Sequence, residues 1–379
     1  MKLLHTADWH LGKRLYGTDR LAEARTALAE IAEIAVDEAP DAIIVAGDLL
    51  DRRPVDEEPL GVCLDALAAL AEVAPILAVT GNHDDEAFWG HLGPWMANRG
   101  ITLGHELASA RDAVHTITTA AGPLHAALVP WPAPGELEQP AGVDSGGARR
   151  RFSEWVTEQV TNIGRELARR RAEGGASVLV GHLMIAGART GGGERELSLG
   201  PASALAGEDL PAADYTALGH IHLPQPVPGA TAEAYYSGSP IALDFSESAD
   251  TKGVLIAEIS DGATEVRQVA VRSGRPLIRL RGSLDGLEAR AAEHPGALFA
   301  CEVESDGAEQ DLARRVRDLV PDAIRVEPAV SALVTAEAAD ETTTDSDLAE
   351  LYAEWYAREG RPLSDAQRDA FALARQAAS

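Results

Sequence analysis

Three short apolar runs, separated by two amphipathic stretches, fill the first 80 residues and constrain the fold more than any other feature of the chain. The runs cover residues 2–8, 41–48 and 74–80, and each has the length of a buried strand. The stretches between them, 19–39 and 57–73, carry Leu, Ile and Ala at helical spacing. Strands that alternate with helices in this way predict a parallel sheet with right-handed crossovers.

Further strands are predicted by apolar runs of similar length, which lie at residues 125–130, 177–182 and 215–219. Three more runs predict a second, more antiparallel sheet, and they lie near 233–237, 253–259 and 265–271. Helical spacing predicts helices over 88–99 and 152–167. Residues 132–150 are rich in Pro, Gly and acidic residues, so we expect a mobile surface loop there.

The composition changes after residue 273, and the remainder of the chain divides into two parts. In residues 274–333 the patterns typical of strand, helix, strand, helix and strand follow one another, which predicts a small α/β module. Residues 334–379 begin with an acidic, Thr-rich stretch typical of a linker, and two helical patterns follow. We therefore expect one large domain over 1–273, a module over 274–333 and a helical tail over 334–379.

The charge of the chain limits how it can bind nucleic acid. It has 379 residues and a formal net charge of -27. A protein that holds DNA by charge alone is basic, so a free-standing, high-affinity DNA binder is not expected. A DNA-processing enzyme stays compatible, because metal ions and a partner can supply positive charge.

Cysteine content and hydropathy favour a cytoplasmic protein. The two cysteines, Cys63 and Cys301, lie far apart and outside any metal-ligand spacing, so we expect no disulfide framework. No apolar run approaches the length of a membrane span, so we expect no association with a membrane.

Eight polar side chains stand where the predicted strands end, and most of them adjoin a glycine. They are Asp8, His10, Asp48, Asn82, His83, His182, His220 and His222. Strand ends converge at one edge of a sheet, so we expect these groups to meet there. Carboxylate, imidazole and amide ligands together suit Mn²⁺, Fe²⁺ or Zn²⁺ more than Ca²⁺. A single Asp or His here is more often a cap or a surface group, but eight together indicate a metal centre.

As a set, these motifs resemble the signature of the calcineurin-like metallophosphoesterases, over roughly the first two-thirds of the chain. Two narrower blocks, residues 5–12 together with 15–17, and residues 236–240, resemble the SbcD exonuclease-subunit family, the bacterial counterpart of the recombination-repair nucleases. The resemblance implies an α/β fold, in which a two-sheet sandwich flanked by helices precedes a small α/β capping domain and partner-binding C-terminal helices.

The resemblance implies that two divalent metal ions, expected to be Mn²⁺, share the site. One ion takes Asp8, His10 and His222, the other takes Asn82, His182 and His220, and Asp48 bridges them. Two metals about 3.5–4 Å apart hold a phosphodiester and lower the pKa of a bridging water. His83 is placed to protonate the leaving oxygen or to stabilise charge on the phosphoryl group. Asp84 either orients a neighbouring side chain or only closes the turn.

Candidate contacts with DNA and with partners complete the expected site. Lys13, Arg14 and Tyr16 follow the first motif directly, and we expect them to touch the DNA backbone, with a solvated loop as the alternative. An apolar stripe in the tail favours docking on an SbcC-like ABC/SMC-type ATPase, and packing on its own domain is the alternative. The stripe consists of Leu348, Leu351, Tyr352, Trp355 and Tyr356.

The family also implies a homodimer within a heterotetramer. Candidate interface residues lie on two predicted helices and are Leu60, Leu64, Leu67, Leu92, Trp95 and Met96, although many of them must also serve the core.

The implied function is that of the metal-dependent DNA nuclease subunit of an SbcCD-like complex, which serves DNA repair, recombination and replication. The implied activities are a 3′-to-5′ exonuclease on double strands and an endonuclease on single strands and hairpins. Two alternatives stay open. A small-molecule phosphodiesterase or phosphatase would need neither the capping domain nor the tail. A non-catalytic DNA-end tether in an ATPase complex would not need an intact ligand set. The chain has no Gly-rich phosphate loop, so any ATP would bind to a partner.

Overall fold

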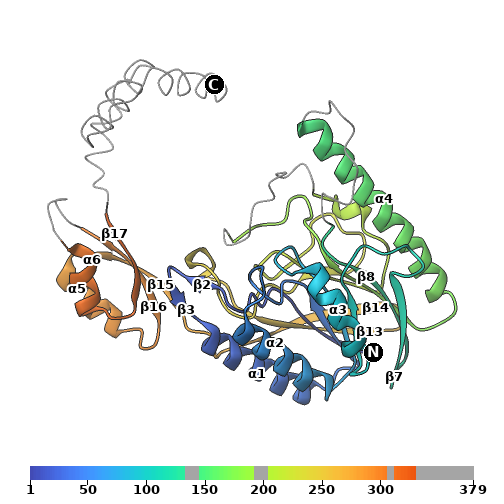
Figure 1. The fold of residues 1–379 in the computed structure, drawn as a ribbon, viewed down its shortest axis with the longest axis horizontal. Helices are drawn as coiled ribbons and strands as arrows, with labels where there is room; N and C mark the ends of the chain where they lie inside the picture. Colours follow the sequence, from blue (N-terminus) through green and yellow to red (C-terminus); the bar gives the residue numbers. More distant parts are fainter. Residues whose placement is uncertain (133–144, 192–203, 305–310, 330–379) are drawn as a thin grey trace.

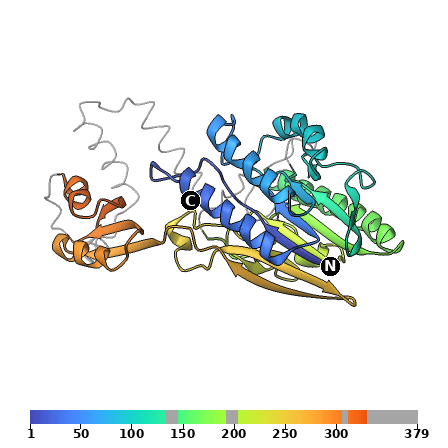
Figure 2. The ribbon, with the colours of Figure 1, turned by 90° about the horizontal axis from the view of Figure 1, so that it is seen from below.

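Two stacked six-stranded sheets form the body of the molecule, and a three-stranded sheet lies to one side of them (Figure 1, Figure 2). The computed structural model describes residues 1–132, 145–191, 204–304 and 311–329. The predicted tail, with its apolar stripe and its last helix, lies outside the described residues. Within those ranges, no helix combines the length and the apolar run that crossing a lipid bilayer requires.

The first sheet has the strand order β14-β13-β1-β4-β5-β6. Its strands are β1 (Lys2–Thr6), β4 (Ala42–Ala46), β5 (Ile76–Val79), β6 (Ile101–Gly104), β13 (Gly253–Ser260) and β14 (Ala263–Ala270). The strands β1, β4, β5 and β6 run parallel, which confirms the predicted parallel sheet. The hairpin of β13 and β14 pairs antiparallel along the other side of β1.

Assigning 253–259 and 265–271 to the second sheet was therefore wrong. An apolar pattern indicates that a strand is buried, but it does not indicate which strand it pairs with. Any strand edge with unpaired backbone N–H and C=O groups can form hydrogen bonds with it. The free edge of β1 takes this hairpin, although more than 240 residues of chain separate β1 from β13.

The second sheet has the order β11-β12-β10-β9-β8-β7. Its strands are β7 (Val114–Thr119), β8 (Gly122–Val129), β9 (Ala176–His182), β10 (Tyr215–Gly219), β11 (Gln225–Pro226) and β12 (Ala234–Tyr236). The strands β8, β9, β10 and β12 run parallel, and only the edge strands β7 and β11 pair antiparallel. This sheet is thus mixed and mainly parallel, whereas the sequence predicted a more antiparallel one, and of the three strands predicted for it only β12 lies in it.

Alternate residues of the central strands enter two different cores. In β4, Ala42, Ile44 and Ala46 face the second sheet, while Ile43 and Val45 face the helices. All five are fully buried, which explains why the strand is a continuous apolar run. The outer face of the first sheet is covered by α1 (Leu21–Glu38), α2 (Glu57–Ala71) and α3 (Glu86–Ala97). The helix α4 (Ser145–Arg171) covers the second sheet (Figure 2).

The start of α4 corrects the predicted loop over 132–150. Residues 145–150 are helical, and 133–144 lie outside the described part of the chain. Ala148, Arg150 and Arg151 have high helix propensity, so they extend the helix toward its N-terminus despite two glycines.

The smaller sheet has the order β15-β16-β17, and its strands run parallel. Its elements are β15 (Leu277–Gly282), α5 (Leu284–Ala292), β16 (Leu298–Val303), α6 (Leu312–Leu319) and β17 (Ala323–Pro328). They follow the predicted order and enclose their own apolar core. We call this unit the capping module.

The capping module packs on the large body through a separate apolar cluster. Phe245 lies in the short 3₁₀ helix η4 (Phe245–Glu247), and it clusters with Leu277 and Leu298 of the module. On the hairpin of β2 (Arg14–Leu15) and β3 (Thr18–Asp19), the Tyr16 hydroxyl accepts a hydrogen bond of 2.8 Å from Arg325. The module therefore contacts the segments that flank the predicted metal site.

Candidate metal centre

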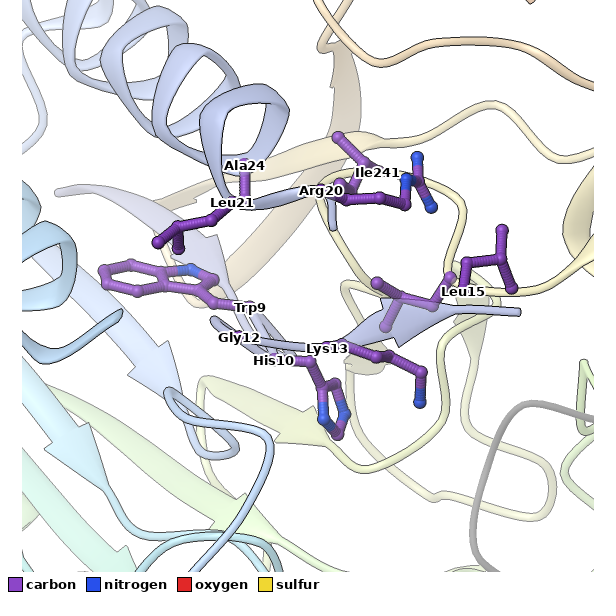
Figure 3. A pocket seen from close by; sticks show the side chains of 10 residues that line it. Trp9, His10, Gly12, Lys13, Leu15, Arg20, Leu21, Ala24 and Ile241 are labelled. Atoms are coloured by element: carbon purple, nitrogen blue, oxygen red, sulfur yellow. The ribbon is translucent and has the colours of Figure 1, made fainter. Parts of the chain in front are cut away.

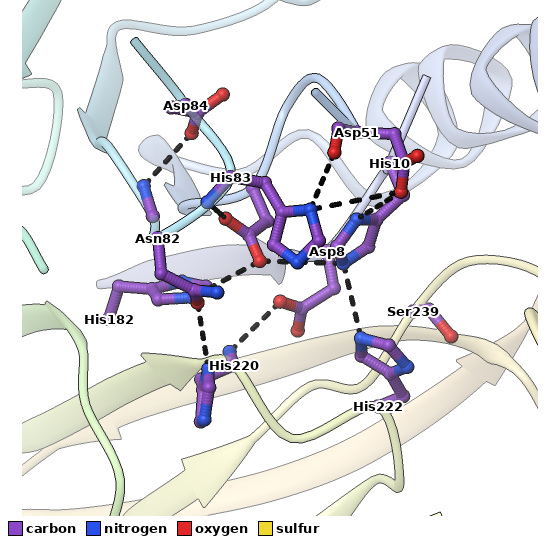
Figure 4. A network of polar contacts seen from close by, with 12 residues as sticks. Asp8, His10, Asp51, Asn82, His83, Asp84, His182, His220, His222 and Ser239 are labelled. Atoms are coloured by element: carbon purple, nitrogen blue, oxygen red, sulfur yellow. Dashed lines mark hydrogen bonds and ion pairs between the residues drawn. The ribbon is translucent and has the colours of Figure 1, made fainter. Parts of the chain in front are cut away.

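The eight polar side chains predicted at strand ends converge on one place, which Figure 4 shows for all of them except Asp48, and Asp48 contacts His10 and His182. Asp8 and His10 follow β1, Asp48 follows β4, Asn82 and His83 follow β5, His182 ends β9, and His220 and His222 follow β10. The expectation that one sheet supplies them all was wrong, since β9 and β10 belong to the second sheet. The stacked sheets place the ends of their strands together, and the Nδ1 of His182 lies 2.8 Å from the carbonyl oxygen of Ala46.

Unusual backbone conformations make this convergence possible. Four of the eight residues adopt a left-handed conformation, which is uncommon for non-glycine residues and collects at functional sites. They are Asp8, His10, Asp48 and His220, with φ angles of 55°, 43°, 52° and 97°. Neighbouring glycines allow close approach, because a Cβ on Gly81 would lie 2.1 Å from Oδ1 of Asp48. A Cβ on Gly219 would lie 1.9 Å from the Ala46 carbonyl oxygen.

A first ligand group consists of Asp8, His10 and His222, whose ligand atoms lie within 4.8 Å of one another. The Nδ1 of His222 makes a hydrogen bond of 3.1 Å to Glu247, whereas the Nδ1 of His10 lies 3.3 Å from Asp51 outside hydrogen-bond geometry. A neutral imidazole that donates from Nδ1 carries a lone pair on Nε2. The Nε2 atoms of His222 and His10 face each other at 3.1 Å, and Oδ2 of Asp8 is buried with no hydrogen-bond partner among the described residues. These donor atoms fit a shared cation.

A second ligand group consists of Asn82, His182 and His220. Because Nδ1 of His182 donates to the Ala46 carbonyl, Nε2 is the nitrogen that is left to face the site. That Nε2 lies 3.1 Å from Oδ1 of Asn82 and 3.4 Å from Oδ2 of Asp48, which are both acceptors. The Nδ1 of His220 lies 3.0 Å from the same Asn82 oxygen. These ligand atoms, like those of the first group, are arranged to bind a cation.

Asp48 lies between the two groups. Its Oδ2 is 3.4 Å from Nε2 of His10 and 3.4 Å from Nε2 of His182. Its Oδ1 accepts a hydrogen bond of 2.8 Å from the backbone of His83. One carboxylate oxygen is therefore fixed by the protein, while the other is shared by both ligand groups.

Burial and neighbouring charges set the protonation of these side chains. Burial lowers the pKa of His10 to about 3 and that of His220 well below its usual value, so both are neutral ligands. Burial raises the pKa of Asp8 to about 6. Burial opposes ionisation of Asp48, but His182 and His10 hold its pKa well below the usual range. Burial also disfavours the charged form of His182, but Asp48 raises its pKa to about 9. The raised pKa of His182 and the lowered pKa of Asp48 favour an imidazolium–carboxylate pair, whose proton a metal would replace.

His83 lies beside the first ligand group without being part of either. It is buried, and its ring packs edge-on against that of His10 with centroids 4.5 Å apart. Its Nδ1 lies 2.6 Å from the carbonyl oxygen of Asp51, which fixes the ring orientation. A ring nitrogen of His83 lies within 4.8 Å of ligand atoms of His10 and Asp48. His83 is thus near enough to act on a substrate held there.

Asp84 ties together the loops that carry the ligands. Its Oδ1 accepts hydrogen bonds from the backbone of Leu50 (3.1 Å) and the indole of Trp89 (3.3 Å). Its Oδ2 accepts from the backbones of Leu49 (3.2 Å) and Gly81 (2.9 Å). These four donors come from the loop after β4, from the end of β5 and from α3. The geometry favours a positioning role for Asp84 over proton transfer.

Four residues around the centre were missed by the sequence reasoning. The indole of Trp131 lies 5.0 Å from the ring of His220, and its place after β8 is the same strand-end signal that found the other groups. Asp51 follows Asp48 by three residues and lies beside His10. Glu247 contacts His222, and Lys252 contacts Glu247. No local pattern marks this last pair, since Glu247 stands 25 residues beyond its histidine.

The three predicted DNA contacts occupy different surroundings. Lys13 is partly exposed, lies 3.8 Å from Asp51, and lines a cavity of about 10 Å³ beside His10 (Figure 3). Such a volume holds one water molecule at most, so the cavity is no substrate site. Arg14 is exposed and donates to the carbonyl of Gly17 at 2.7 Å. Tyr16 is 46% exposed and faces the capping module.

The predicted dimer residues are only partly accessible. Leu67 and Met96 are fully buried in the core under the first sheet, so they cannot contact a second chain. Trp95 is 43% exposed, and the guanidinium of Arg99 lies 3.5 Å from its ring centre. Leu60, Leu64 and Leu92 are half-buried and stay candidates, as does Trp95.

Comparison with known proteins gives matches to the large domain and to the C-terminal region of the chain. Residues 1–224 match the family model of the calcineurin-like phosphoesterases, and residues 273–359 match the model described as the type 5 capsule protein repressor C-terminal domain. The SbcD subunit of nuclease SbcCD from Bacillus subtilis is 32% identical over 291 residues, which are 75% of this chain and 73% of that protein. The SbcD subunit from Escherichia coli is 29% identical over 331 residues, which are 84% and 82% of the two chains. A dimetal phosphatase from Danio rerio has a TM-score of 0.46 and 10% identity, over 72% of this chain and 96% of that one.

Proposed function

Because the chain belongs to the calcineurin-like phosphoesterase family and, within it, to the SbcD nuclease subunits, we propose that it cleaves phosphodiester bonds in DNA as the nuclease subunit of an SbcCD-type complex. The observation that carries this proposal is the pair of ligand groups that share Asp48, because two adjoining cation sites are the arrangement by which two-metal enzymes hold and cleave a phosphodiester. The chain is accordingly a metal-dependent phosphodiester hydrolase.

We assign the two ligand groups to two divalent metal ions. Asp8, His10 and His222 would hold one ion, Asn82, His182 and His220 would hold the other, and Asp48 would contact both. The chemistry that such a pair supplies when bound is activation of a water and neutralisation of charge on the phosphodiester. We propose Mn²⁺, since a set of carboxylate, imidazole and amide ligands is borderline-hard.

His83 is the proposed general acid for the leaving oxygen. The contact of its Nδ1 with the Asp51 carbonyl fixes the tautomer, so proton exchange with the substrate would use Nε2. Burial beside His10 keeps the ring in place during the reaction. Asp84 supports this arrangement through the backbone, by holding the loop that carries Asp48 against the end of β5.

Lys13, Arg14 and Tyr16 are the proposed contacts with the DNA backbone. What supports the proposal is their place on the segment that runs from His10 to the contact of Tyr16 with the capping module. Charge reversal at Lys13 and Arg14 should abolish cleavage at raised salt, because phosphate contacts dominate salt-dependent binding. Arg25→Glu on the exposed face of α1 is the matched control. Unchanged cleavage by the double reversal at raised salt would remove these residues from the DNA interface.

The proposed assembly is a homodimer of this chain within a heterotetramer that contains an SbcC-like ABC/SMC-type ATPase. The tail stripe over 348–356 is the proposed docking segment, and residues 273–359 match a family model. The sequence contains no Gly-rich phosphate loop, so we propose that ATP acts through the partner. We place the complex in the cytoplasm, on DNA and not on a membrane.

The test compares substrates with and without the ATPase partner. Full-length chain with Mn²⁺ is given a blunt DNA duplex, a hairpin-ended duplex and a small aryl phosphodiester. We expect cleavage of both DNA substrates, stimulated by the partner and ATP. Hydrolysis of the small ester alone would favour a small-molecule phosphodiesterase. Binding of DNA ends without cleavage of any substrate would favour a tether.

A further inference from the structure

A buried ion pair lies directly behind one of the candidate metal ligands. Oε1 of Glu247 is 3.1 Å from Nδ1 of His222, on the side of the ring away from His10. The other oxygen of Glu247 lies 2.7 Å from Nζ of Lys252 and accepts a hydrogen bond of 3.0 Å from the backbone of Leu243. Glu247 is fully buried, and Lys252 is 7% exposed.

Lys252 is tied to the same histidine by a second route. Its Nζ donates to the backbone carbonyl of His222 at 2.8 Å and to the hydroxyl of Ser239 at 3.1 Å. Both the ring and the main chain of His222 are therefore held by one ion pair. Two charges removed from water cost several kcal/mol each unless their partners are well placed, so a buried pair is a poor device for stability alone.

The placement of this pair has a chemical meaning for a metal ligand. A carboxylate that accepts from one imidazole nitrogen keeps the hydrogen on that atom and increases the basicity of the other nitrogen. The other nitrogen of His222 is the Nε2 that faces His10 and the first ligand group. In the second group, a neutral backbone carbonyl at Ala46 plays the corresponding part for His182. His222 therefore has a charged group behind its ring, whereas His182 has a neutral one.

We propose that Glu247, held by Lys252, is a positioning residue that fixes the tautomer and orientation of His222 and so sets the metal affinity of the first ligand group. This inference rests on the proposed function, because it takes both ligand groups to be metal sites. It assigns a role to two residues outside the ligand set, and it predicts that their effect is confined to one of the two sites.

The 3₁₀ helix η4 and its surroundings are built to keep Glu247 in place. Arg20, at the start of α1, donates a hydrogen bond to the backbone carbonyl of Ala242. The next residue, Leu243, donates its backbone N–H to the carboxylate of Glu247. Phe245, two residues before Glu247, is buried against the capping module. The carboxylate is therefore anchored from two directions and has little freedom to leave His222.

The test measures Mn²⁺ binding to the full-length chain by calorimetry and by electron paramagnetic resonance. Glu247→Gln removes the charge and keeps the size of the side chain. Glu247→Asp keeps the charge but shortens the side chain by one methylene, which moves the carboxylate away from His222. This second variant tests the inference if Glu247→Gln fails to fold. Glu265→Gln on β14 is exposed and makes the same change in net charge, so it is the control. Thermal unfolding checks that each chain is folded.

We expect wild type and Glu265→Gln to bind two Mn²⁺ ions and to give the spectrum of an exchange-coupled pair. Both Glu247 variants should bind one ion with wild-type affinity and the other about 10–100-fold more weakly, which is the usual effect of losing such an outer contact. At two equivalents of Mn²⁺ their spectrum should be that of isolated ions. Folded Glu247 variants with two wild-type affinities, or with equal losses at both sites, would overturn the inference. Wild type that binds two ions but cleaves no phosphodiester would overturn the proposed function and leave this inference intact.

Discussion

Substitution of Asp84 by Asn should destabilise the large body strongly, although it replaces a single oxygen atom. Each carboxylate oxygen of Asp84 accepts two N–H groups, from Leu50 and Trp89 on one side and from Leu49 and Gly81 on the other. The amide of Asn has one acceptor and one donor group. Whichever way it is turned, two buried N–H groups then face an NH₂ group.

The magnitude follows from those two donors. A buried donor left without an acceptor costs about 1–3 kcal/mol, so the pair costs about 4 kcal/mol in the free energy of unfolding. For a domain of this size, each kcal/mol shifts Tm by roughly 2–4 °C. We therefore expect Asp84→Asn to lower the Tm of the large body by on the order of 10 °C.

The adjacent Asp85 provides a matched control. Asp85 is the N-cap of α3 and accepts one hydrogen bond of 3.0 Å, from the backbone of Phe88. Asn caps a helix about as well as Asp, so Asp85→Asn makes the same change in charge with little effect on stability. Thermal unfolding followed by tryptophan fluorescence measures both variants. An Asp84→Asn chain that melts within about 2 °C of Asp85→Asn would refute the view that this carboxylate holds the ligand loops together.

Two further predictions concern the metals. The pKa of His182 is raised to about 9 and that of Asp8 to about 6, so metal binding at pH 7 should release about one proton, from His182. Metal affinity should therefore rise with pH up to about 9. Calorimetry in two buffers with different ionisation enthalpies measures the proton release, and a binding heat that is independent of the buffer would contradict it. Mn²⁺ at 100 times its Kd should stabilise the fold by about 2.7 kcal/mol per site. A chelator should therefore lower the Tm of wild type and His83→Gln but hardly that of Asp48→Ala, and equal shifts in all three would count against Asp48 as a shared ligand.

The parts of the site that could be predicted are those in which a side chain follows its own strand. The ligands after β1, β4 and β5 are short polar motifs at the ends of apolar runs, and their positions need no knowledge of distant contacts. The same is true of the histidines after β9 and β10. A residue such as Trp131 obeys this rule as well, and it was missed only because an aromatic ring is not an obvious ligand.

Other features depend on pairing that the local sequence does not encode. The hairpin of β13 and β14 has a clear strand pattern, but its partner β1 lies at the far end of the chain. In the sequence Glu247 is an ordinary acidic residue, and only the fold places it behind His222. The division of the ligands between two sheets is equally invisible, since a strand end has the same appearance in either sheet. Such contacts are set by tertiary packing, and patterns of polarity along the chain report only burial.

The most direct test of the central claim is Mn²⁺-dependent cleavage of a hairpin-ended DNA duplex by wild type, Asp48→Ala and His83→Gln, with metal content measured on the same samples. We predict that wild type cleaves, that Asp48→Ala neither cleaves nor retains two metals, and that His83→Gln retains two metals but does not cleave. Cleavage by Asp48→Ala at the wild-type rate would contradict a two-metal centre that shares this carboxylate.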